Sequence, residues 1–217
     1  MTRAERKIQT YENILAVSAK LFLEKGYEKT RMQDITKASG LAKGTIFYHF
    51  KSKEAILHAV LLRQGDASEQ IFRDWIKELE GLKAREKIMV ILERNFEDSR
   101  LRCFDHVIAT QMQNPHFIVA NMQEAVNRNA PILAQLFREG LKDRSIKTEF
   151  PDECAEVLLL LMNTWCDPVL FECNSARLNR RLEFIQVFAK QFGAGIVNDK
   201  FIISYKKYIK KIYVRIK

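Results

Sequence analysis

The sequence predicts an all-α protein, and three observations support this fold class. Eight glycines and four prolines in 217 residues are too few for a many-stranded sandwich or barrel, which needs a turn about every 8–12 residues. Hydrophobic residues at 47% and charged residues at 29% are typical of a chain that folds rather than of a disordered one. Apolar residues also recur at helical spacing along most of the chain.

The first 55 residues are predicted to form short helices separated by turns. Ile14, Leu15, Ser18, Leu21 and Phe22 share one face of the first helix, which is expected to end at Gly26. This helix is therefore predicted to bury one side against the elements that follow it.

The next two helices have the spacing of a helix-turn-helix. Thr30 and Gln33 are spaced as a capping box, which predicts a second helix from Thr30 to about Ala38. The turn 39–41 contains a glycine and leads into a third short helix, predicted from Ala42 to about Phe50. In such a motif the second of the two helices enters the major groove of DNA.

Longer helices are predicted for the body of the chain, residues 56–198. Pro131 is expected to restart or kink a helix, and Pro168 is expected to kink another, because proline lacks an N–H group. The predicted segments are about 53–79, 84–112 with an interruption near Arg100, 117–145, a helix opened by Pro151 and a last long helix from Asn174 to Phe192.

The last segment, residues 199–217, has a different pattern. Its apolar side chains repeat at alternating spacings of three and four, and lysines fill most of the remaining surface. This predicts a basic amphipathic helix that docks on the body, contacts DNA, packs on a partner subunit or lies on an anionic membrane, the last being the weakest alternative. Its apolar stripe is Ile202, Tyr205, Ile209, Ile212 and Ile216.

The net charge of +9 is concentrated at the two ends of the chain. Residues 1–55 carry +5, residues 56–198 carry −2 and residues 199–217 carry +6. We therefore expect an anionic partner at the ends and a ligand or a second subunit at the body.

Several functional classes find no support in the sequence. The four cysteines form no C-x-x-C pair, and no hydrolase elbow, zinc-protease motif or phosphate-binding glycine loop is present. We therefore predict no catalytic residues, no metal and no cofactor, and no enzymatic activity. A charged N-terminus and no apolar run of about 20 residues predict a cytoplasmic protein with free thiols, associated with the nucleoid.

The N-terminal motif resembles a known family. Residues 14–54, and above all the run Lys43-Gly44-Thr45-Ile46-Phe47-Tyr48-His49-Phe50, look like the DNA-binding domain of TetR/AcrR-type transcriptional regulators. The resemblance implies a homodimer in which the last two body helices of each subunit pack as a four-helix bundle. It also implies a ligand cavity in the body and a DNA-reading helix at 43–49.

The residues expected to contact DNA follow from this motif. Lys43 begins the reading helix, Gly44 allows close approach to the groove, and Tyr48 and His49 lie on its exposed side. Thr30 and Lys53 lie at helix N-termini that suit a phosphate. The predicted set is Thr30, Lys43, Gly44, Thr45, Tyr48, His49 and Lys53.

Two departures from the family pattern have physical consequences. Ala42 stands where Ser or Thr is common, so the reading helix is predicted to lack a side-chain cap. Phe47 stands where Tyr is common, so the phosphate contact of that hydroxyl is expected to pass to Tyr48.

The body contains many aromatic and methionine side chains, most of which are expected to form core. A ligand site in a helical bundle would combine such residues with a few polar groups. His106 beside Asp105 also fits a structural histidine. The predicted ligand-binding residues are Phe104, His106, Met112, Met122, Phe137, Asn163 and Trp165.

Together these features predict a sequence-specific DNA-binding regulator, a repressor that a small molecule releases from its operator. The predicted domains are a helix-turn-helix domain (1–55), a ligand-binding and dimerisation domain (56–198) and the terminal helix (199–217). The alternative is a DNA-bound organising protein that recruits a partner or a membrane surface. Genome-wide occupancy distinguishes the two, since a regulator binds a few promoters and an organiser binds many scattered sites.

Overall fold

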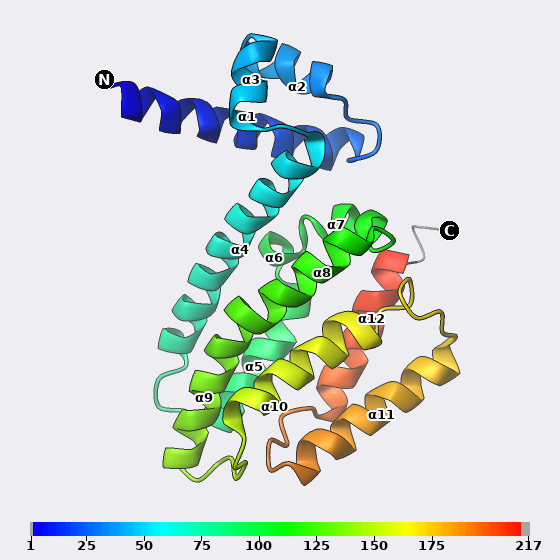
Figure 1. Ribbon diagram of the computed structural model, residues 1–217. Coiled ribbons are helices and arrows are strands. Elements are labelled where there is room, and N and C mark those ends of the chain that lie inside the picture. Colours follow the sequence, from blue (N-terminus) through cyan, green and yellow to red (C-terminus); the bar gives the residue numbers. More distant parts are fainter. Residues whose placement is uncertain (1, 214–217) are drawn as a thin grey trace. The chain divides into compact units, whose positions relative to one another are not determined.

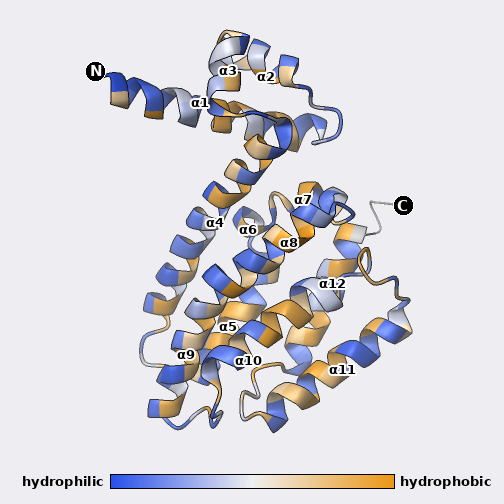
Figure 2. Ribbon diagram, viewed as in Figure 1, coloured by the Kyte–Doolittle hydropathy of each residue, from blue (hydrophilic) through white to orange (hydrophobic). Residues whose placement is uncertain are grey.

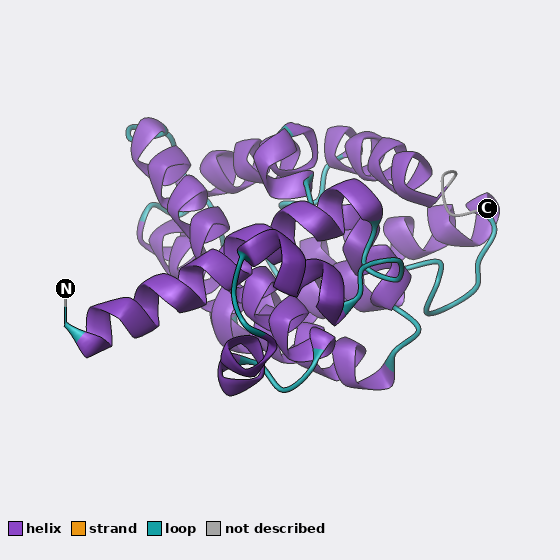
Figure 3. Cartoon of the chain, turned by 90° about the horizontal axis from the view of Figure 1, so that it is seen from above, coloured by secondary structure: helices purple, strands orange, loops and turns teal. Residues whose placement is uncertain are grey.

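The computed structural model describes residues 2–213, and every regular element in that range is a helix, as the sequence predicts (Figures 1 and 3). The α-helices are α1 (Arg3–Lys25), α2 (Met32–Ser39), α3 (Lys43–His49), α4 (Lys53–Glu78), α5 (Ala84–Glu97), α6 (Ser99–Arg102), α7 (Asp105–Gln111), α8 (Pro115–Glu124), α9 (Ala130–Lys142), α10 (Pro151–Leu160), α11 (Ser175–Gln191) and α12 (Asp199–Tyr213). Two π-helical segments, η1 (Ala125–Asn129) and η2 (Leu161–Trp165), follow α8 and α10.

The chain forms two compact units. One contains the residues up to Ile71 together with Cys103–Val107, and the other contains Phe72–Arg102 together with the residues from Ile108 onward. The boundary therefore falls inside α4, whereas the sequence places a domain boundary at residue 55, where the helix-turn-helix pattern ends.

The first unit packs α1, α2, α3 and the start of α4 around a small apolar core. Ile14, Leu15 and Phe22 of α1 are almost completely buried, as the predicted apolar face requires, and Ile35 of α2 and Ile46 of α3 are also buried. Their removal from water supplies the main driving force for folding this unit. The helix ends at Gly26, which has a positive φ of 84°.

The second unit is built on α5, α9 and α10. The helix α9 packs against both α5 and α10, and α11 packs against α10. The ribbons of these helices carry hydrophobic stretches (Figure 2), and Phe137 of α9 is fully buried. Gly140 lets α9 pass close to Ile146, because a Cβ atom there would lie 2.7 Å from the Ile146 side chain.

The π-helical segments interrupt two helices of this unit. The segment η1 ends just before Pro131, and the Ala130 N–H bonds to the Ala125 carbonyl, five residues back. The predicted restart at Pro131 is confirmed, and it takes the form of a π-helical segment. Such segments arise where one extra residue enters a helical turn, a feature that apolar periodicity does not reveal.

The kink predicted at Pro168 is wrong, because the helix ends before it. The segment η2 stops at Trp165, and the Asp167 carboxylate accepts the N–H groups of Val169 and Leu170 at 2.7 and 3.1 Å. Cys166 and Cys173 therefore lie outside the regular helices, after η2 and before α11. Both are free thiols, and burial raises the pKa of Cys166 to about 12, so this thiol is protonated at neutral pH.

The helix α12 docks on α5 through the predicted apolar stripe. Ile202, Tyr205, Ile209 and Ile212 are all buried, while Ile216 lies outside the described residues. The docked helix is the simplest of the arrangements that the sequence left open for this segment.

Aromatic contacts anchor α12. The Phe96 ring of α5 lies 5.4 Å from the Phe201 ring, 5.6 Å from the Tyr205 ring and 5.2 Å from the Tyr208 ring. The Tyr205 hydroxyl donates to the Met162 carbonyl at 2.9 Å, and so reaches η2. The terminal helix is thus an integral part of the second unit.

Candidate nucleic-acid interface and ligand-binding residues

The turn between α2 and α3 has the geometry of a helix-turn-helix. Gly40 adopts the left-handed conformation, with φ 67° and ψ 14°, and this ends α2. The Asn13 side chain of α1 donates to the Ser39 carbonyl at 3.3 Å, which fixes the turn to α1. Three residues separate the two helices, so α3 leaves the turn in a defined direction.

The two faces of α3 differ sharply. Ile46 and the following Phe50 are buried in the first unit, while Lys43 and Gly44 are exposed. Tyr48 has 64% of its surface exposed, and Thr45 and His49 are half-buried. The structure thus brings five of the seven predicted DNA-binding residues, Lys43, Gly44, Thr45, Tyr48 and His49, together on this short helix.

The start of α3 lacks a side-chain cap, as the sequence predicts. Ala42 is the N-cap residue, and no side chain bonds the free N–H groups of the first turn. The Lys43 ammonium instead lies 5.7 Å from the centre of the Phe47 ring. The first turn of α3 therefore depends on backbone bonds from Thr45 and Ile46 to the Ala42 carbonyl.

The helix α1 contributes residues to this surface that the sequence analysis missed. The Lys7 ammonium lies 5.5 Å from the centre of the Tyr48 ring, and the Tyr11 ring stacks on Phe50 at 5.0 Å and lies 6.2 Å from His49. Burial and the charge of Lys7 lower the pKa of His49. The helical spacing of Lys7, Tyr11 and Ile14 was the available signal, since it places all three on one face of α1.

Thr30 is in a different environment from the one predicted. Its side chain is 1% exposed, and its hydroxyl donates to the Gly26 carbonyl at 2.8 Å. The predicted Thr30–Gln33 capping box is wrong: α2 begins at Met32, and the Arg31 N–H donates to Asp34 Oδ2 at 2.8 Å. The Thr30 side chain consequently has almost no surface to offer to a phosphate.

Lys53 has a structural role in addition to its predicted one. Its ammonium donates to the Tyr27 carbonyl at 2.9 Å and lies 4.0 Å from the centre of the Tyr27 ring. The Tyr27 hydroxyl donates to Glu54 Oε1 at 3.3 Å, and burial together with the Glu54 charge raises the pKa of Tyr27. Lys53 therefore ties the start of α4 to the loop after α1.

The predicted ligand-binding residues are divided between the two compact units. Phe104 and His106 fall in the segment that belongs to the first unit, and the other five belong to the second. Phe104, Met112 and Phe137 are buried, and Met122 and Trp165 are half-buried. His106 and Asn163 are exposed in the single chain.

No three His, Cys, Asp or Glu side chains of residues 2–213 are gathered as metal ligands would be. Over the same range, no helix is long and apolar enough to cross a bilayer.

Comparison with known proteins places the helix-turn-helix within a described family. The model of bacterial regulatory proteins, tetR family, matches residues 14–60, which contain most of α1, all of α2 and α3 and the start of α4. The match therefore covers all the predicted DNA-binding residues, whereas Lys7 and Tyr11 of α1 lie before it.

Two curated proteins resemble a larger part of the chain. The fatty acid metabolism regulator protein of Bacillus subtilis is 29% identical over 149 residues, which cover 66% of this chain and 74% of that protein. The HTH-type transcriptional regulator UidR of Escherichia coli is 24% identical over 184 residues, which cover 85% of this chain and 91% of that one. The similarity therefore extends from the first unit into the second.

A solved structure has the same fold. A TetR-family transcriptional regulator from Mesorhizobium loti aligns with a TM-score of 0.59 at 22% identity, covering 89% of this chain and all of that one. The agreement in fold includes both units.

Proposed function

The chain belongs to the TetR family of DNA-binding transcriptional regulators, and on this premise we propose that it is a homodimeric repressor that a small molecule releases from its operator. The observation that carries the proposal is the exposed face of α3. There Lys43, Gly44 and Tyr48 project from a helix whose opposite face is buried, as a helix that enters the major groove requires.

The side chains of α3 are suited to different parts of DNA. Lys43, in the first turn, can donate to guanine O6 and N7 or to a phosphate, and the Thr45 methyl can meet a thymine methyl. The Tyr48 hydroxyl can donate to a phosphate in place of the one that Phe47 lacks. Phosphate contacts fix the position of the helix, and base contacts select the sequence.

A face formed by α10 and α11 supports the homodimer. Phe184 and Val187 of α11 are each 53% exposed, and Val157 of α10 and Phe192 at the end of α11 are exposed as well. Large apolar side chains gathered on neighbouring helices indicate a protein interface. A two-fold contact here would give the four-helix bundle that the family resemblance implies, and two α3 helices for two half-sites.

The second unit is proposed to hold the ligand. Its buried and half-buried candidates, Met112, Met122, Phe137 and Trp165, offer polarisable, apolar surface. The similarity to a fatty acid metabolism regulator favours an apolar small molecule of that general kind. The segments η1 and η2 lie in this unit, and π-helical turns inside helices occur frequently at functional sites.

Genome-wide occupancy of the full chain tests the function. We expect binding at one or a few promoters, and binding at many scattered sites would instead identify an organising protein. Fragments recovered in this way then serve in a release assay, in which fluorescence anisotropy follows the labelled fragment while fatty acids and their acyl esters are added. Failure of every fragment to bind the purified dimer in dilute salt would refute the proposal.

A further inference from the structure

Two charged stripes lie on neighbouring helices of the second unit. The helix α5 carries Glu86, Glu93 and Glu97, spaced i, i+7 and i+11. The helix α12 carries Lys200, Lys207 and Lys211 at the same spacing. This spacing puts each set on one face of its helix, and all six side chains are exposed except Glu93, which is half-buried.

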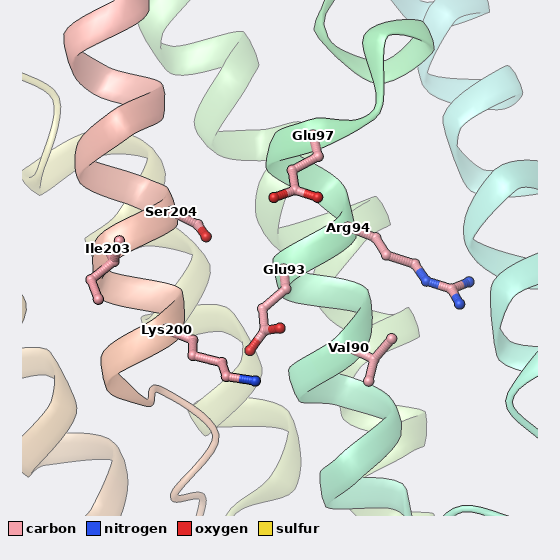
Figure 4. Close-up of a pocket in the computed structure, with 7 residues that line it drawn as sticks. All are labelled: Val90, Glu93, Arg94, Glu97, Lys200, Ile203 and Ser204. Carbon is pink, nitrogen blue, oxygen red and sulfur yellow. The ribbon is translucent and has the colours of Figure 1, made fainter.

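A groove separates the two stripes. It has a volume of about 330 Å³, and in Figure 4 the Glu93 and Glu97 carboxylates point from α5 toward α12 while the Lys200 ammonium points back. A second groove of about 460 Å³ shares Val90, Glu93 and Lys200 with the first and extends toward Glu86. Ile203, which is 52% exposed, and Val90 are the apolar residues that line the first groove.

Each stripe keeps its formal charge within the chain, although Glu93 Oε1 accepts a hydrogen bond from the Asn198 side chain at 3.5 Å. Arg94, the other cation of the groove, forms two hydrogen bonds with Glu78 at 2.8 and 3.0 Å and points away from α12 (Figure 4). Between the residues that the structure describes, no ion pair involves the three glutamates or the three lysines. The acidic and basic stripes are thus both available to an outside partner.

This arrangement disfavours a polyanion as that partner. A DNA duplex or an anionic membrane drawn to the lysines would meet the neighbouring glutamates, and like charges repel it. Insertion of α12 into a membrane would also need its apolar stripe, which is buried against the unit. The fitting partner carries acidic and basic stripes itself, at matching spacing.

We propose that this partner is a second copy of the chain. A two-fold axis in the plane of contact exchanges the stripes, so that the glutamates of α5 in each copy face the lysines of α12 in the other. The interface is self-complementary, as a two-fold contact must be, and both salt-bridge rows form at once. It involves α5 and α12, and is therefore separate from the α10–α11 face proposed for the homodimer.

The physical character of the contact follows from its composition. Exposed ion pairs are weak and are screened by salt, and of the described residues that line the first groove only Val90 and Ile203 are apolar. The association is consequently weak and strongest in dilute salt. Used together with the α10–α11 face, it joins dimers into larger assemblies, which would favour occupation of neighbouring operators.

Sedimentation velocity of the full chain tests the proposal directly. We expect species larger than the dimer at about 50 mM salt and protein concentrations near 100 µM, and their disappearance at about 0.5 M salt. A protein that stays a dimer under all of these conditions overturns the proposal.

Charge-reversal variants identify the surface. The variant Glu93→Lys/Glu97→Lys reverses two of the three charges of the α5 stripe, and Lys207→Glu/Lys211→Glu reverses two of the three charges of the α12 stripe. Each alone is expected to lose at least about tenfold in self-association, because like charges then face each other. An equimolar mixture should recover it, since the lysines introduced in α5 of one copy then face the glutamates introduced in α12 of the other. Failure of the mixture to recover the association contradicts the proposed pairing.

Matched controls separate the pairing from net charge. The variants Glu80→Lys/Glu149→Lys and Lys142→Glu/Lys147→Glu change the charge equally at exposed positions outside the stripes, and should associate like the wild type. Binding to a mixed-sequence DNA duplex and to phosphatidylglycerol vesicles is measured in parallel. If Lys207→Glu/Lys211→Glu weakens either binding and leaves assembly unchanged, the lysine stripe serves a polyanion and the proposal is wrong.

Discussion

In the first unit, some residues hold α3 in place and others are exposed on its outer face. Ile46 and Phe50 anchor the helix, and Tyr11 stacks on Phe50, while Lys43 and Tyr48 face outward. Because anchoring and presenting residues alternate along one short helix, substitutions of its outward-facing residues can change DNA binding with little effect on folding.

Lys43 and Lys53 are expected to affect DNA binding differently. Lys43→Ala should cost about 1–3 kcal/mol on the preferred sequence and alter the preference, because a base contact is lost. Lys53→Ala should weaken binding evenly across sequences and lower the salt slope by about one, as loss of one phosphate contact does. Anisotropy titrations over a series of salt concentrations measure both effects.

The Lys53 variant also needs a stability control, since Lys53 holds the Tyr27 carbonyl. Thermal unfolding of both variants should therefore be recorded alongside. If both variants bind like the wild type at every salt concentration, neither lysine contacts DNA.

The pKa of His49 provides a test of the contact between α1 and α3. Burial lowers it first and the Lys7 charge second, so Lys7→Gln should raise it part of the way toward 6.5, the ordinary value. An NMR titration of the His49 ring protons measures the change. Lys20→Gln, on an exposed part of α1, should leave the pKa unaltered, and an equal shift in both variants would mean that Lys7 does not act on His49.

The same pKa fixes the sign of a pH effect on stability. Because the folded pKa lies below the unfolded one, the unfolded chain binds more protons as the pH falls through about 6.5. The free energy of unfolding should therefore decrease from pH 7.5 to about pH 5.5 by more in the wild type than in His49→Gln, and the opposite order would contradict this assignment.

The helices differ in how far their sequences determine their ends. The helix α1 has a capping box at Thr2, where the Glu5 N–H donates to Thr2 Oγ1 at 3.2 Å and the Thr2 N–H donates to Glu5 Oε2 at 2.8 Å. The helix α3 begins at Ala42 with no such cap. The reading helix is thus the less firmly started of the two, although its contacts with DNA demand a fixed position.

A cap introduced at residue 42 should strengthen α3. Ala42→Ser is expected to add about 1 kcal/mol to the stability of the first unit, because the hydroxyl can accept one of the free N–H groups. Hydrogen exchange of the α3 amides should slow in Ala42→Ser and not in Ala42→Val, which has no acceptor. Equal exchange in both variants would show that the cap does not limit this helix.

The turn after α11 depends on Gly193. Its φ is 73°, and a Cβ atom there would lie 2.7 Å from the Lys147 carbonyl carbon, which is backbone and cannot move aside. Gly193→Ala should therefore cost about 2–4 kcal/mol. Gly81→Ala, where φ is also positive but nothing lies within 4 Å, should cost about 1–2 kcal/mol in the same urea titrations.

Local sequence patterns predicted most of the helices. The features that they did not predict depend on tertiary contacts. The helix-turn-helix and the stripe of α12 were readable because their apolar spacing is regular. Thr30 was misplaced because a hydroxyl that can cap a helix can equally bond a carbonyl in the core, and only the fold decides. The segments η1 and η2, and the groove between α5 and α12, depend on contacts between distant parts of the chain.

At the scale of the whole molecule, the uneven charge now has a structural basis. The basic first unit carries the DNA-reading helix, and the basic α12 is fixed to a body that is slightly acidic. The ligand residues were the least predictable, because polar side chains such as His106 and Asn163 look alike in sequence whether they face a cavity or solvent.

The α10–α11 face gives a test of the proposed dimer. Phe184→Glu/Val187→Glu should convert the protein to a monomer at micromolar concentration, because charges replace the exposed apolar centre. Sedimentation equilibrium measures the mass, and operator binding should fall because each half-site is then bound alone. Leu141→Glu, an exposed apolar residue of α9, is the control, and a dimer that persists in the double variant rules out this face.

The contacts of α12 also set an order of events during synthesis of the chain. The Arg102 guanidinium donates to the Tyr208 hydroxyl, 106 residues later in the chain. The surface around Phe96 is therefore synthesised long before α12, the helix that covers it. At about 5–20 residues per second, translation needs roughly 5–20 s to cross that interval. The first unit has all of α1, α2 and α3 by then, whereas the second carries an uncovered aromatic surface that chaperones would recognise. During synthesis, the DNA-reading helix α3 is therefore complete before α12 is available to cover the second unit.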